Sequence, residues 1–534
     1  MKKMILSVEK LTLAVNEKYL LNQVSFQIGK GEVFALVGES GSGKSLTSLA
    51  IMRLLPQAIQ VVSGDIRLKE ESLFTIPEYD MQHIRGRKIA MIFQEPMTAL
   101  NPVMTIGEQV AEVLRLHLNL SSSEIKKRVV SLFEEVSLPD AAARYDWYPY
   151  QLSGGQKQRV MIAMALACEP DLLIADEPTT ALDVTVQKQV LELLSQIRER
   201  RQLSILFITH DMAVVAQVAD RIAVMRHGEI VEMAEREHFF TSPSHPYTKK
   251  LLQDALGRKG SREQGAGDRL LEVKDVKVHF PVKKGLFQRT VGYVKAVDGV
   301  SFSIEKGKTL ALVGESGSGK STIGQAILSL VPVTEGHIYF EGVDLATLSP
   351  RERKIYRKKI QVIFQDPFSA LDPRMPIAEI LREGMDALSV GPQGREAQDL
   401  YMKELLKTVD LEPEFLYRYP HEFSGGQRQR IGIARALAVE PELIICDEPT
   451  SALDVSVRAQ VLTLLKRLQD ERGISYLFIT HDLSIISTIA DEVAVMKQGR
   501  IVEQGCVDDV MGSPTNPYTQ TLLKAAPKLP DITL

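Results

Sequence analysis

The stretch GESGSGKS occupies residues 38–45 and occurs again, unaltered, at residues 314–321. Each copy follows an apolar, strand-like run, such as VFALV at residues 33–37, and precedes a stretch that favours a helix. This order predicts a glycine-rich loop at a strand-to-helix corner. Two such corners in one chain predict two similar domains.

Five further landmarks each repeat after 271 residues, against 276 for the two loops, and they extend the similarity far beyond the loops. The pairs are Gln94 and Gln365, Ser153 and Ser424, Asp176 and Asp447, His210 and His481, and Pro246 and Pro517. A constant spacing over so many landmarks indicates a duplicated domain. We therefore predict a first domain over 1–256 and a second over 270–534. The polar, glycine-rich residues 257–269 form the predicted linker between them.

Composition narrows the class of protein. The 534 residues are 44% hydrophobic and 25% charged, with a formal net charge of -4, which is ordinary for a globular chain and gives no long-range attraction to nucleic acid. We expect no nucleic-acid partner. The three cysteines show no C-x-x-C spacing, so neither a zinc knuckle nor an iron–sulfur centre is predicted. Neither a signal peptide nor an apolar run long enough to cross a bilayer is evident, so membrane contact is expected only through a partner.

Apolar runs indicate the elements around the loops. Residues 89–93, 172–175 and 205–209 are typical of buried strands in a mainly parallel sheet. Residues 105–138 differ, because apolar side chains recur there at helical spacing and Ser121 with Glu124 forms a capping-box pattern. A helical insertion is the expected result.

The glycine-rich loops predict a phosphate site. Their backbone amides can approach phosphate oxygens, and the helix behind presents a partial positive charge. Lys44 and Lys320 are expected to contact the β- and γ-phosphates, and the hydroxyls of Ser45 and Ser321 to ligate Mg²⁺. The predicted phosphate-binding residues are Gly38, Glu39, Ser40, Gly41, Ser42, Gly43, Lys44, Ser45, Gly314, Glu315, Ser316, Gly317, Ser318, Gly319, Lys320 and Ser321.

Paired carboxylates end two of the predicted strands, at Asp176-Glu177 and at Asp447-Glu448. Neighbouring residues of a strand point to opposite faces, so the two carboxylates can have different roles. The aspartate can hold Mg²⁺, and Glu177 or Glu448 can polarise the attacking water as general base.

A further motif, LSGGQ at 152–156 and FSGGQ at 423–427, supplies a serine and glycine amides at a helix start, which is a second anion site. It resembles the signature motif of ATP-binding cassette (ABC) proteins. The resemblance implies that Ser424 closes over ATP held at Lys44, and Ser153 over ATP held at Lys320, in a head-to-tail internal pseudo-dimer. The nucleotide-contacting residues implied are Ser153, Gly154, Gly155, Gln156, Ser424, Gly425, Gly426 and Gln427.

The same resemblance assigns further roles. Gln94 and Gln365 match the family's Q-loop glutamine, which senses Mg²⁺ and the γ-phosphate, and His210 and His481 match its switch histidine. Phe280 matches the aromatic residue that stacks on adenine, whereas the first half has Val15 there, with Tyr19 as a substitute. The implied catalytic set is Glu177, Glu448, His210, His481, Gln94 and Gln365, and the implied metal ligands are Ser45, Gln94, Asp176, Ser321, Gln365 and Asp447.

The fold class implied is α/β, with two tandem P-loop NTPase domains and the cofactors ATP and Mg²⁺. Each domain would have a RecA-like, mainly parallel sheet core, an antiparallel β subdomain and a helical subdomain. Because each site has a lysine, two carboxylates, a glutamine, a histidine and an opposing signature serine, both sites are expected to hydrolyse ATP.

Proteins of the cassette family have different functions, so the fold alone does not identify the function. The Q-loop stretches 93–102 and 364–373 and the Pro-Tyr-Thr tails 246–248 and 517–519 resemble the ATPases of peptide and nickel importers. The resemblance implies two transmembrane permeases, an extracytoplasmic solute-binding protein, one copy of this chain per transporter, and a peripheral location on the cytoplasmic face of the bacterial inner membrane. The nature of the solute stays open between peptide, peptide-like antibiotic and metal chelate.

Two other classes of cassette ATPase match the residues less well. A soluble tandem cassette ATPase acting on ribosomes would resemble its relatives in a long charged helical linker, which the short glycine-rich stretch 257–269 does not. A DNA-repair cassette would need zinc-binding cysteines, which the spacing of the three cysteines does not provide.

Overall fold

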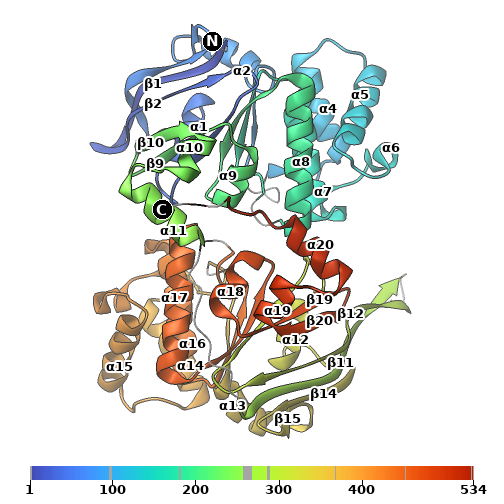
Figure 1. The fold of residues 1–534 in the computed structure, drawn as a ribbon, viewed down its shortest axis with the longest axis vertical. Coiled ribbons are helices and arrows are strands. Elements are labelled where there is room, and N and C mark those ends of the chain that lie inside the picture. The colour runs from blue at the N-terminus through green and yellow to red at the C-terminus, as the bar shows by residue number, and fades with distance from the viewer. Residues whose placement is uncertain are drawn as a thin grey trace. The chain divides into compact units, whose positions relative to one another are not determined.

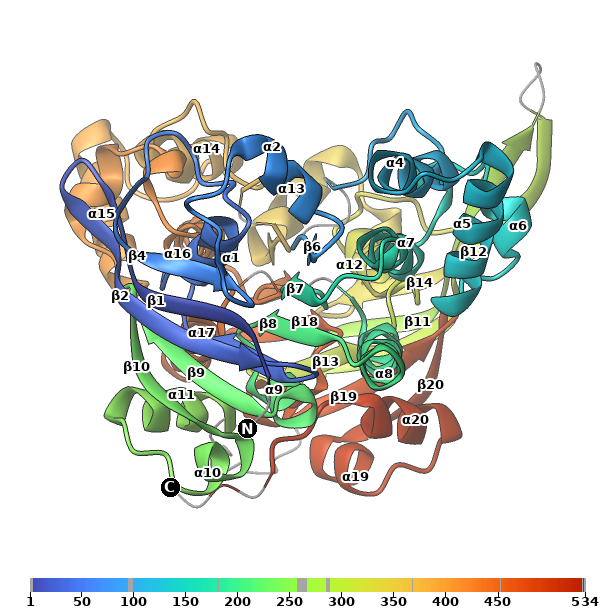
Figure 2. The ribbon, with the colours of Figure 1, turned by 90° about the horizontal axis from the view of Figure 1, so that it is seen from above.

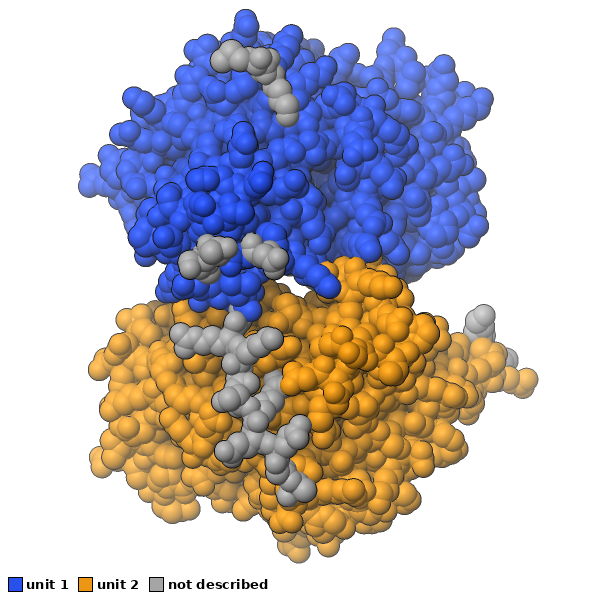
Figure 3. Space-filling model, viewed as in Figure 1, with its two compact units in different colours: residues 1–182, 186–256, 527–534 blue, residues 183–185, 257–526 orange. Residues whose placement is uncertain are grey.

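A computed structural model describes residues 3–94, 99–179, 182–256, 267–284, 289–366, 368–451, 453–530 and 532. The chain forms two compact units (Figure 3). The first contains residues 1–182, 186–256 and 527–534, and the second contains residues 183–185 and 257–526. The predicted domain limits stay a prediction. Residues 183–185, expected in the first domain, group with the second unit, and residues 527–534, expected in the second domain, group with the first. Most of the predicted linker, 257–266, lies outside the described residues.

A six-stranded sheet forms the centre of the first unit, in the order β10-β9-β3-β8-β7-β6. All neighbours in it are parallel except β9 and β10. Its strands are β3 (Val33–Val37), β6 (Ile89–Ile92), β7 (Leu172–Asp176), β8 (Ser204–Ile208), β9 (Arg221–Arg226) and β10 (Glu229–Glu235). The three apolar runs predicted as buried strands correspond to β6, β7 and β8, so that prediction is confirmed.

An antiparallel sheet, in the order β2-β1-β4-β5, packs on one face of this central sheet. It consists of β1 (Met4–Val15), β2 (Lys18–Gly29), β4 (Gln60–Leu68) and β5 (Glu71–Ser72). Leu172 and Ile174 of β7 join the apolar core beneath it, whereas Leu173 and Ala175 join the core on the opposite face. This alternation follows from the two-residue period of a strand, and burial on both faces explains the continuous apolar sequence.

Helices cover the remaining surfaces of the first unit, with α7 and α8 on the side of the central sheet away from β1 and β2 (Figures 1 and 2). They are α1 (Lys44–Ile51), α2 (Glu78–Ile84), α4 (Ile106–His117), α5 (Ser122–Glu135), α6 (Ala141–Arg144), η1 (Pro149–Gln151), α7 (Gly154–Leu166), α8 (Val184–Arg201), α9 (Met212–Val218), α10 (Arg236–Thr241) and α11 (Pro246–Leu256). The helical insertion is confirmed as α4 and α5, and the capping box of Ser121 and Glu124 begins α5.

The second unit repeats this plan. Its central sheet has the order β16-β17-β18-β13-β19-β20, and its antiparallel sheet has the order β12-β11-β14-β15. The strands are β11 (Arg269–Lys284), β12 (Arg289–Glu305), β13 (Thr309–Val313), β14 (Glu335–Phe340), β15 (Val343–Asp344), β16 (Ile360–Ile363), β17 (Leu443–Asp447), β18 (Ser475–Thr480), β19 (Glu492–Lys497) and β20 (Arg500–Cys506).

The helices of the second unit also follow the first. They are α12 (Lys320–Ile327), η2 (Leu345–Thr347), α13 (Pro350–Lys359), α14 (Ile377–Leu388), α15 (Arg395–Thr408), η3 (Pro413–Tyr417), η4 (Pro420–Glu422), α16 (Gly425–Leu437), α17 (Val455–Arg472), η5 (Leu483–Ile485), α18 (Ile486–Ile489), α19 (Val507–Gly512) and α20 (Pro517–Ala525). The predicted α/β fold, with parallel core, antiparallel subdomain and helical subdomain in each half, is confirmed. No helix among the described residues is both long and apolar enough to span a lipid bilayer.

Candidate ATP sites

The strand order places the predicted site residues at one edge of each central sheet. In the first unit the neighbours β3, β8, β7 and β6 are parallel, so their carboxyl ends meet at that edge. The phosphate loop follows β3, His210 follows β8, Glu177 follows β7 and Gln94 follows β6. Ligands of open α/β sheets bind at this edge.

The phosphate loop is held by its own lysine. Lys44 Nζ donates to the carbonyl oxygens of Gly38 and Glu39, both at 2.8 Å, and Lys320 Nζ does the same to Gly314 at 2.8 Å and Glu315 at 2.9 Å. Burial lowers the pKa of Lys320, although nearby carboxylates oppose that shift. A buried ammonium group in this position can give up its hydrogen bonds to these carbonyl oxygens and donate to phosphate oxygens in their place.

The first glycine of each loop fits its surroundings only because it lacks a side chain. A Cβ added at Gly38 would lie 2.1 Å from the carbonyl oxygen of Met225, and one at Gly314 would lie 2.2 Å from that of Met496. The start of the loop therefore rests directly on the end of β9 or β19.

The serine and aspartate predicted to hold Mg²⁺ are in contact. Ser45 Oγ donates to Asp176 Oδ1 at 3.3 Å, and Ser321 Oγ donates to Asp447 Oδ1 at 2.9 Å. Burial raises the pKa of Asp176 to about 6, although the Ser45 hydrogen bond opposes it, and burial likewise raises the pKa of Asp447. Because these are hard oxygen donors next to a phosphate loop, the pair fits Mg²⁺.

Each glutamate predicted to act as general base is held at both carboxylate oxygens. Gln94 Nε2 donates to Glu177 Oε2 at 2.8 Å, and His210 Nδ1 lies 3.0 Å from Glu177 Oε1. The second unit repeats this arrangement, with Gln365 Nε2 at 2.9 Å from Glu448 Oε2 and His481 Nδ1 at 3.0 Å from Glu448 Oε1. In each unit, a glutamine and a histidine that are far apart in sequence thus fix the orientation of one glutamate carboxylate.

The electrostatics of the second network favour an ionised base. Burial by itself would raise the pKa of Glu448, but the His481 hydrogen bond and the charge of Lys320 outweigh it and lower the pKa. For His481, burial would lower the pKa, but the Glu448 carboxylate outweighs it and raises the pKa. The pair therefore favours a carboxylate beside a protonated histidine.

Both glutamates have a backbone conformation that is rare for residues other than glycine, with φ of 48° at Glu177 and 47° at Glu448. The amide of Glu177 donates to Ile208 O at 2.8 Å and that of Glu448 to Ile479 O at 2.9 Å, so the neighbouring strand holds this conformation. Such backbone strain is concentrated at functional sites.

The signature residues begin a different helix in each unit. Ser153 caps α7 and Ser424 caps α16, and each forms a capping box with Gln156 or Gln427. A Cβ added at Gly155 would lie 2.5 Å from Val186 Cγ1, whereas one added at Gly154 would meet nothing within 4 Å. Gly155 therefore allows close packing against Val186, whereas Gly154 leaves the start of the helix accessible. Gly425 and Gly426 repeat this division, since only a Cβ at Gly426 would clash, at 2.4 Å from Val457 Cγ1.

The proposed adenine-stacking residue Phe280 lies on β11, opposite Val294 of β12, and is 40% exposed. The matching position in the first unit is Val15, opposite Lys18. Tyr19, opposite Ala14, is 62% exposed and lies next to Leu20, whose carbonyl is close to Gly43 of the phosphate loop. The exposed Tyr19 ring thus belongs to a residue adjacent in sequence to one that contacts the phosphate loop.

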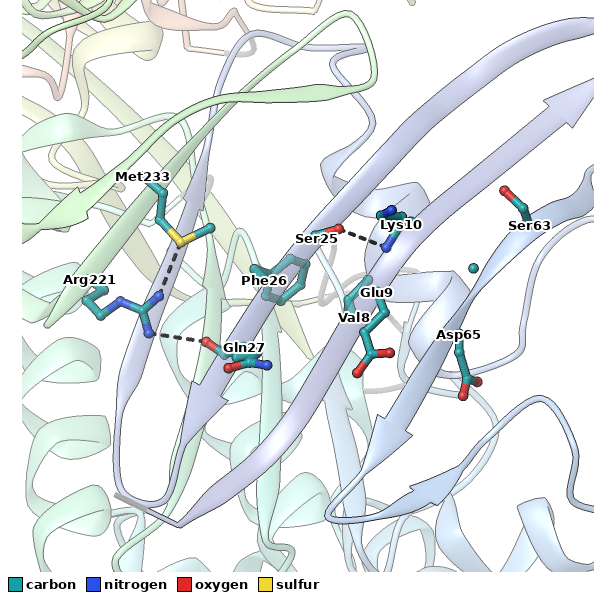
Figure 4. Close-up of a pocket in the computed structure, with 11 residues that line it drawn as sticks. Val8, Glu9, Lys10, Ser25, Phe26, Gln27, Ser63, Asp65, Arg221 and Met233 are labelled. Carbon is teal, nitrogen blue, oxygen red and sulfur yellow. Dashed lines mark hydrogen bonds between the residues drawn. The ribbon is translucent and has the colours of Figure 1, made fainter. Parts of the chain in front are cut away.

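A pocket elsewhere in the first unit is not this site. It has a volume of about 740 Å³ and is lined by β1, β2 and β4 together with Arg221 of β9 and Met233 of β10 (Figure 4). Arg221 donates to the carbonyl oxygen of Gln27 at 3.3 Å and contacts the Met233 sulfur at 3.2 Å. Its lining includes no residue of the phosphate loop.

Sequence reasoning missed one residue near the second site. Tyr518 of the Pro-Tyr-Thr tail accepts a hydrogen bond from the amide of Glu315 at 3.4 Å. The duplication of this tail, which places Tyr247 at the matching position of the first half, is the sequence signal that points to it. Of the quoted Q-loop stretches, residues 95–98 and 367 lie outside the described residues.

Comparison with known proteins decides the family. The family model described as ABC transporter matches residues 21–180 and 297–451, more than half of the chain. The chain belongs to the ABC transporter ATP-binding family. A second model, the oligopeptide/dipeptide transporter C-terminal region, matches residues 231–266 and 502–533, which include both Pro-Tyr-Thr tails.

Two relatives of this ABC ATPase cover nearly its whole length. It is 47% identical to the glutathione import ATP-binding protein GsiA of Escherichia coli O157:H7, over 98% of this chain and 89% of the relative. It is 45% identical to the peptidoglycan transport ATP-binding protein YejF of Agrobacterium fabrum, over 98% of this chain and 96% of the relative.

Proposed function

We propose that the chain is the ATP-hydrolysing subunit that energises an importer of peptides or peptide-like compounds. The duplicated Gln–Glu–His network carries the hydrolytic part of this proposal. The duplicated oligopeptide/dipeptide C-terminal region and the import relatives support the class of solute. No finding favours the ribosomal alternative.

In the proposed reaction the loop amides and Lys44 or Lys320 hold the phosphates of ATP. Glu177 or Glu448 accepts a proton from the attacking water, while the paired glutamine and histidine keep the carboxylate aimed. In the second unit, His481, whose pKa the Glu448 carboxylate raises, would also bring positive charge near the γ-phosphate. Ser45 with Asp176, and Ser321 with Asp447, would hold Mg²⁺, with Gln94 or Gln365 as further ligands, and the ion would neutralise charge on the phosphates.

The partners follow from the transport role. Two permease subunits would form the membrane channel, and a solute-binding protein outside the membrane would deliver the solute. The chain would then be peripheral, on the cytoplasmic face of the bacterial inner membrane, with one copy per transporter.

The direct test isolates the tagged chain from membranes and identifies the proteins bound to it. Two permease-like proteins are expected, and solutes from a peptide library should be depleted from the medium only by cells with intact Glu177 and Glu448. Recovery of ribosomes in place of permeases would contradict the transport role. Uptake of a metal chelate but of no peptide would contradict the solute class.

We further propose that each signature serine serves the nucleotide of the other half. In a K320A chain that also carries E177Q, only Lys44 can hold ATP, and slow hydrolysis allows retained ATP to be counted after rapid gel filtration. Replacing Ser424 by Arg should lower this retention by about tenfold or more, because a bulky cation replaces an anion-binding helix start. The matched change S153R should leave retention unaltered. The reverse pattern would show that each signature serves its own half.

A further inference from the structure

The Pro-Tyr-Thr motif begins a firmly held helix in each unit. The Glu503 carboxylate accepts hydrogen bonds from the Thr515 amide at 2.7 Å and hydroxyl at 2.8 Å, and from the Asn516 amide at 3.3 Å. The Asn516 side chain then caps α20 by accepting from the amide of Tyr518 at 2.9 Å. The position of the Tyr518 ring is therefore fixed by the helix start.

The ring of Tyr518 lies between the phosphate loop and the end of β19. Its hydroxyl accepts from the Glu315 amide at 3.4 Å, and Lys497 Nζ is 4.4 Å from the ring centroid. Burial, together with the nearby Glu315 carboxylate, raises the pKa of Tyr518 to about 12, so the hydroxyl keeps its proton at neutral pH. The tyrosine is a neutral hydrogen-bonding group directly against the loop.

One peptide group is held from both sides. The carbonyl of Gly314 and the amide of Glu315 belong to the same planar peptide. Lys320 Nζ donates to this carbonyl at 2.8 Å, while Tyr518 accepts from the amide. If Lys320 turned to phosphate, it would leave this carbonyl, and the Tyr518 contact with the amide of the same peptide would remain.

The first unit repeats the placement of the ring. Tyr247 is 6% exposed and belongs to the same apolar cluster as Val37, the last residue of β3 before the phosphate loop. The Arg226 guanidinium is 4.7 Å from its ring centroid. The tyrosine and its cation are thus a duplicated feature of the fold.

We propose that Tyr518 is a positioning residue for ATP: it holds the first peptide of the second phosphate loop in the orientation that receives phosphate. The C-terminal helix α20 thereby controls nucleotide affinity at that loop. This rests on the proposed function, in which residues 314–321 bind ATP.

The test uses the full-length chain with K44A, so that nucleotide binding reports the second loop. Tyr518→Phe keeps the ring and removes only the hydroxyl. Because one hydrogen bond is lost, the Kd of a fluorescent ATP analogue should rise about threefold to tenfold. The melting temperature without nucleotide should stay within about 3 °C. Amide hydrogen exchange in residues 314–321 should become faster.

Tyr417→Phe is the matched control, since the Tyr417 hydroxyl also makes one hydrogen bond in the same unit, to Asp399 at 3.1 Å. It should leave the Kd unchanged. An unchanged Kd and unchanged exchange in Y518F, with a loss only in Tyr518→Ala, would show that the ring merely packs and would overturn the inference. Failure of the K44A chain and of the wild type to bind the analogue would instead contradict the proposed function.

Discussion

Replacing Glu448 by Gln is expected to slow ATP hydrolysis at the second site by about 10²- to 10⁴-fold, the usual contribution of a positioned general base. The amide preserves the shape of the side chain and its contact distance to Gln365, but it cannot accept the proton of the attacking water. ATP binding should survive, because Lys320 and the loop amides are untouched. The measurement is phosphate release by the full chain, alongside retention of bound ATP.

Glu177→Gln should have the same effect at the first site, because Gln94 and His210 hold Glu177 at 2.8 Å and 3.0 Å, and their counterparts hold Glu448 at 2.9 Å and 3.0 Å. Glu414→Gln, at an exposed carboxylate on η3, is the control and should leave turnover unchanged. Hydrolysis at the wild-type rate in either E177Q or E448Q would refute the symmetric model, in which both sites turn over.

Replacing Gly314 by Ala is expected to abolish ATP binding at the second loop and to lower the melting temperature, whereas Gly317→Ala should have a much smaller effect. Both glycines have positive φ, 154° and 78°, so both substitutions strain the backbone by about 1–2 kcal/mol. Only at Gly314 would the new Cβ also lie 2.2 Å from the Met496 carbonyl oxygen. The loop would then have to leave the end of β19.

The measurements are thermal unfolding by circular dichroism and binding of an ATP analogue, both on the full chain. Gly38 and Gly41 offer the same comparison in the first unit, since a Cβ at Gly38 would lie 2.1 Å from Met225 O and one at Gly41 would meet nothing within 4 Å. Equal losses of stability and binding at the two positions of a pair would mean that backbone strain alone governs the loop.

Much of each cassette could be predicted from local patterns. The apolar runs predicted β6, β7 and β8 because a strand buried on both faces has no polar positions. The capping box of Ser121 and Glu124 located the start of α5 because it depends on residues only three positions apart. Patterns of this range are fully present in the sequence.

The sequence also identified the chemistry-bearing residues, through a phosphate loop, a carboxylate pair and a signature that occur twice. Which of them meet was decided by the tertiary structure. Gln94, Glu177 and His210 are far apart along the chain, and they converge because β6, β7 and β8 pair in parallel and in register. The order of strands in the sheet depends on how segments far apart in sequence bury their apolar side chains together. A local periodicity of the sequence contains no information on this.

The same reason applies to Tyr518. Its motif could be read in the sequence, but its place against the Glu315 amide follows from how α20 packs on the end of the central sheet. The sequence by itself identified the groups that are proposed to bind and cleave ATP. Only the tertiary structure decided which side chains hydrogen-bond to one another. These bonds join residues at the ends of different strands, and long-range packing aligns those strands.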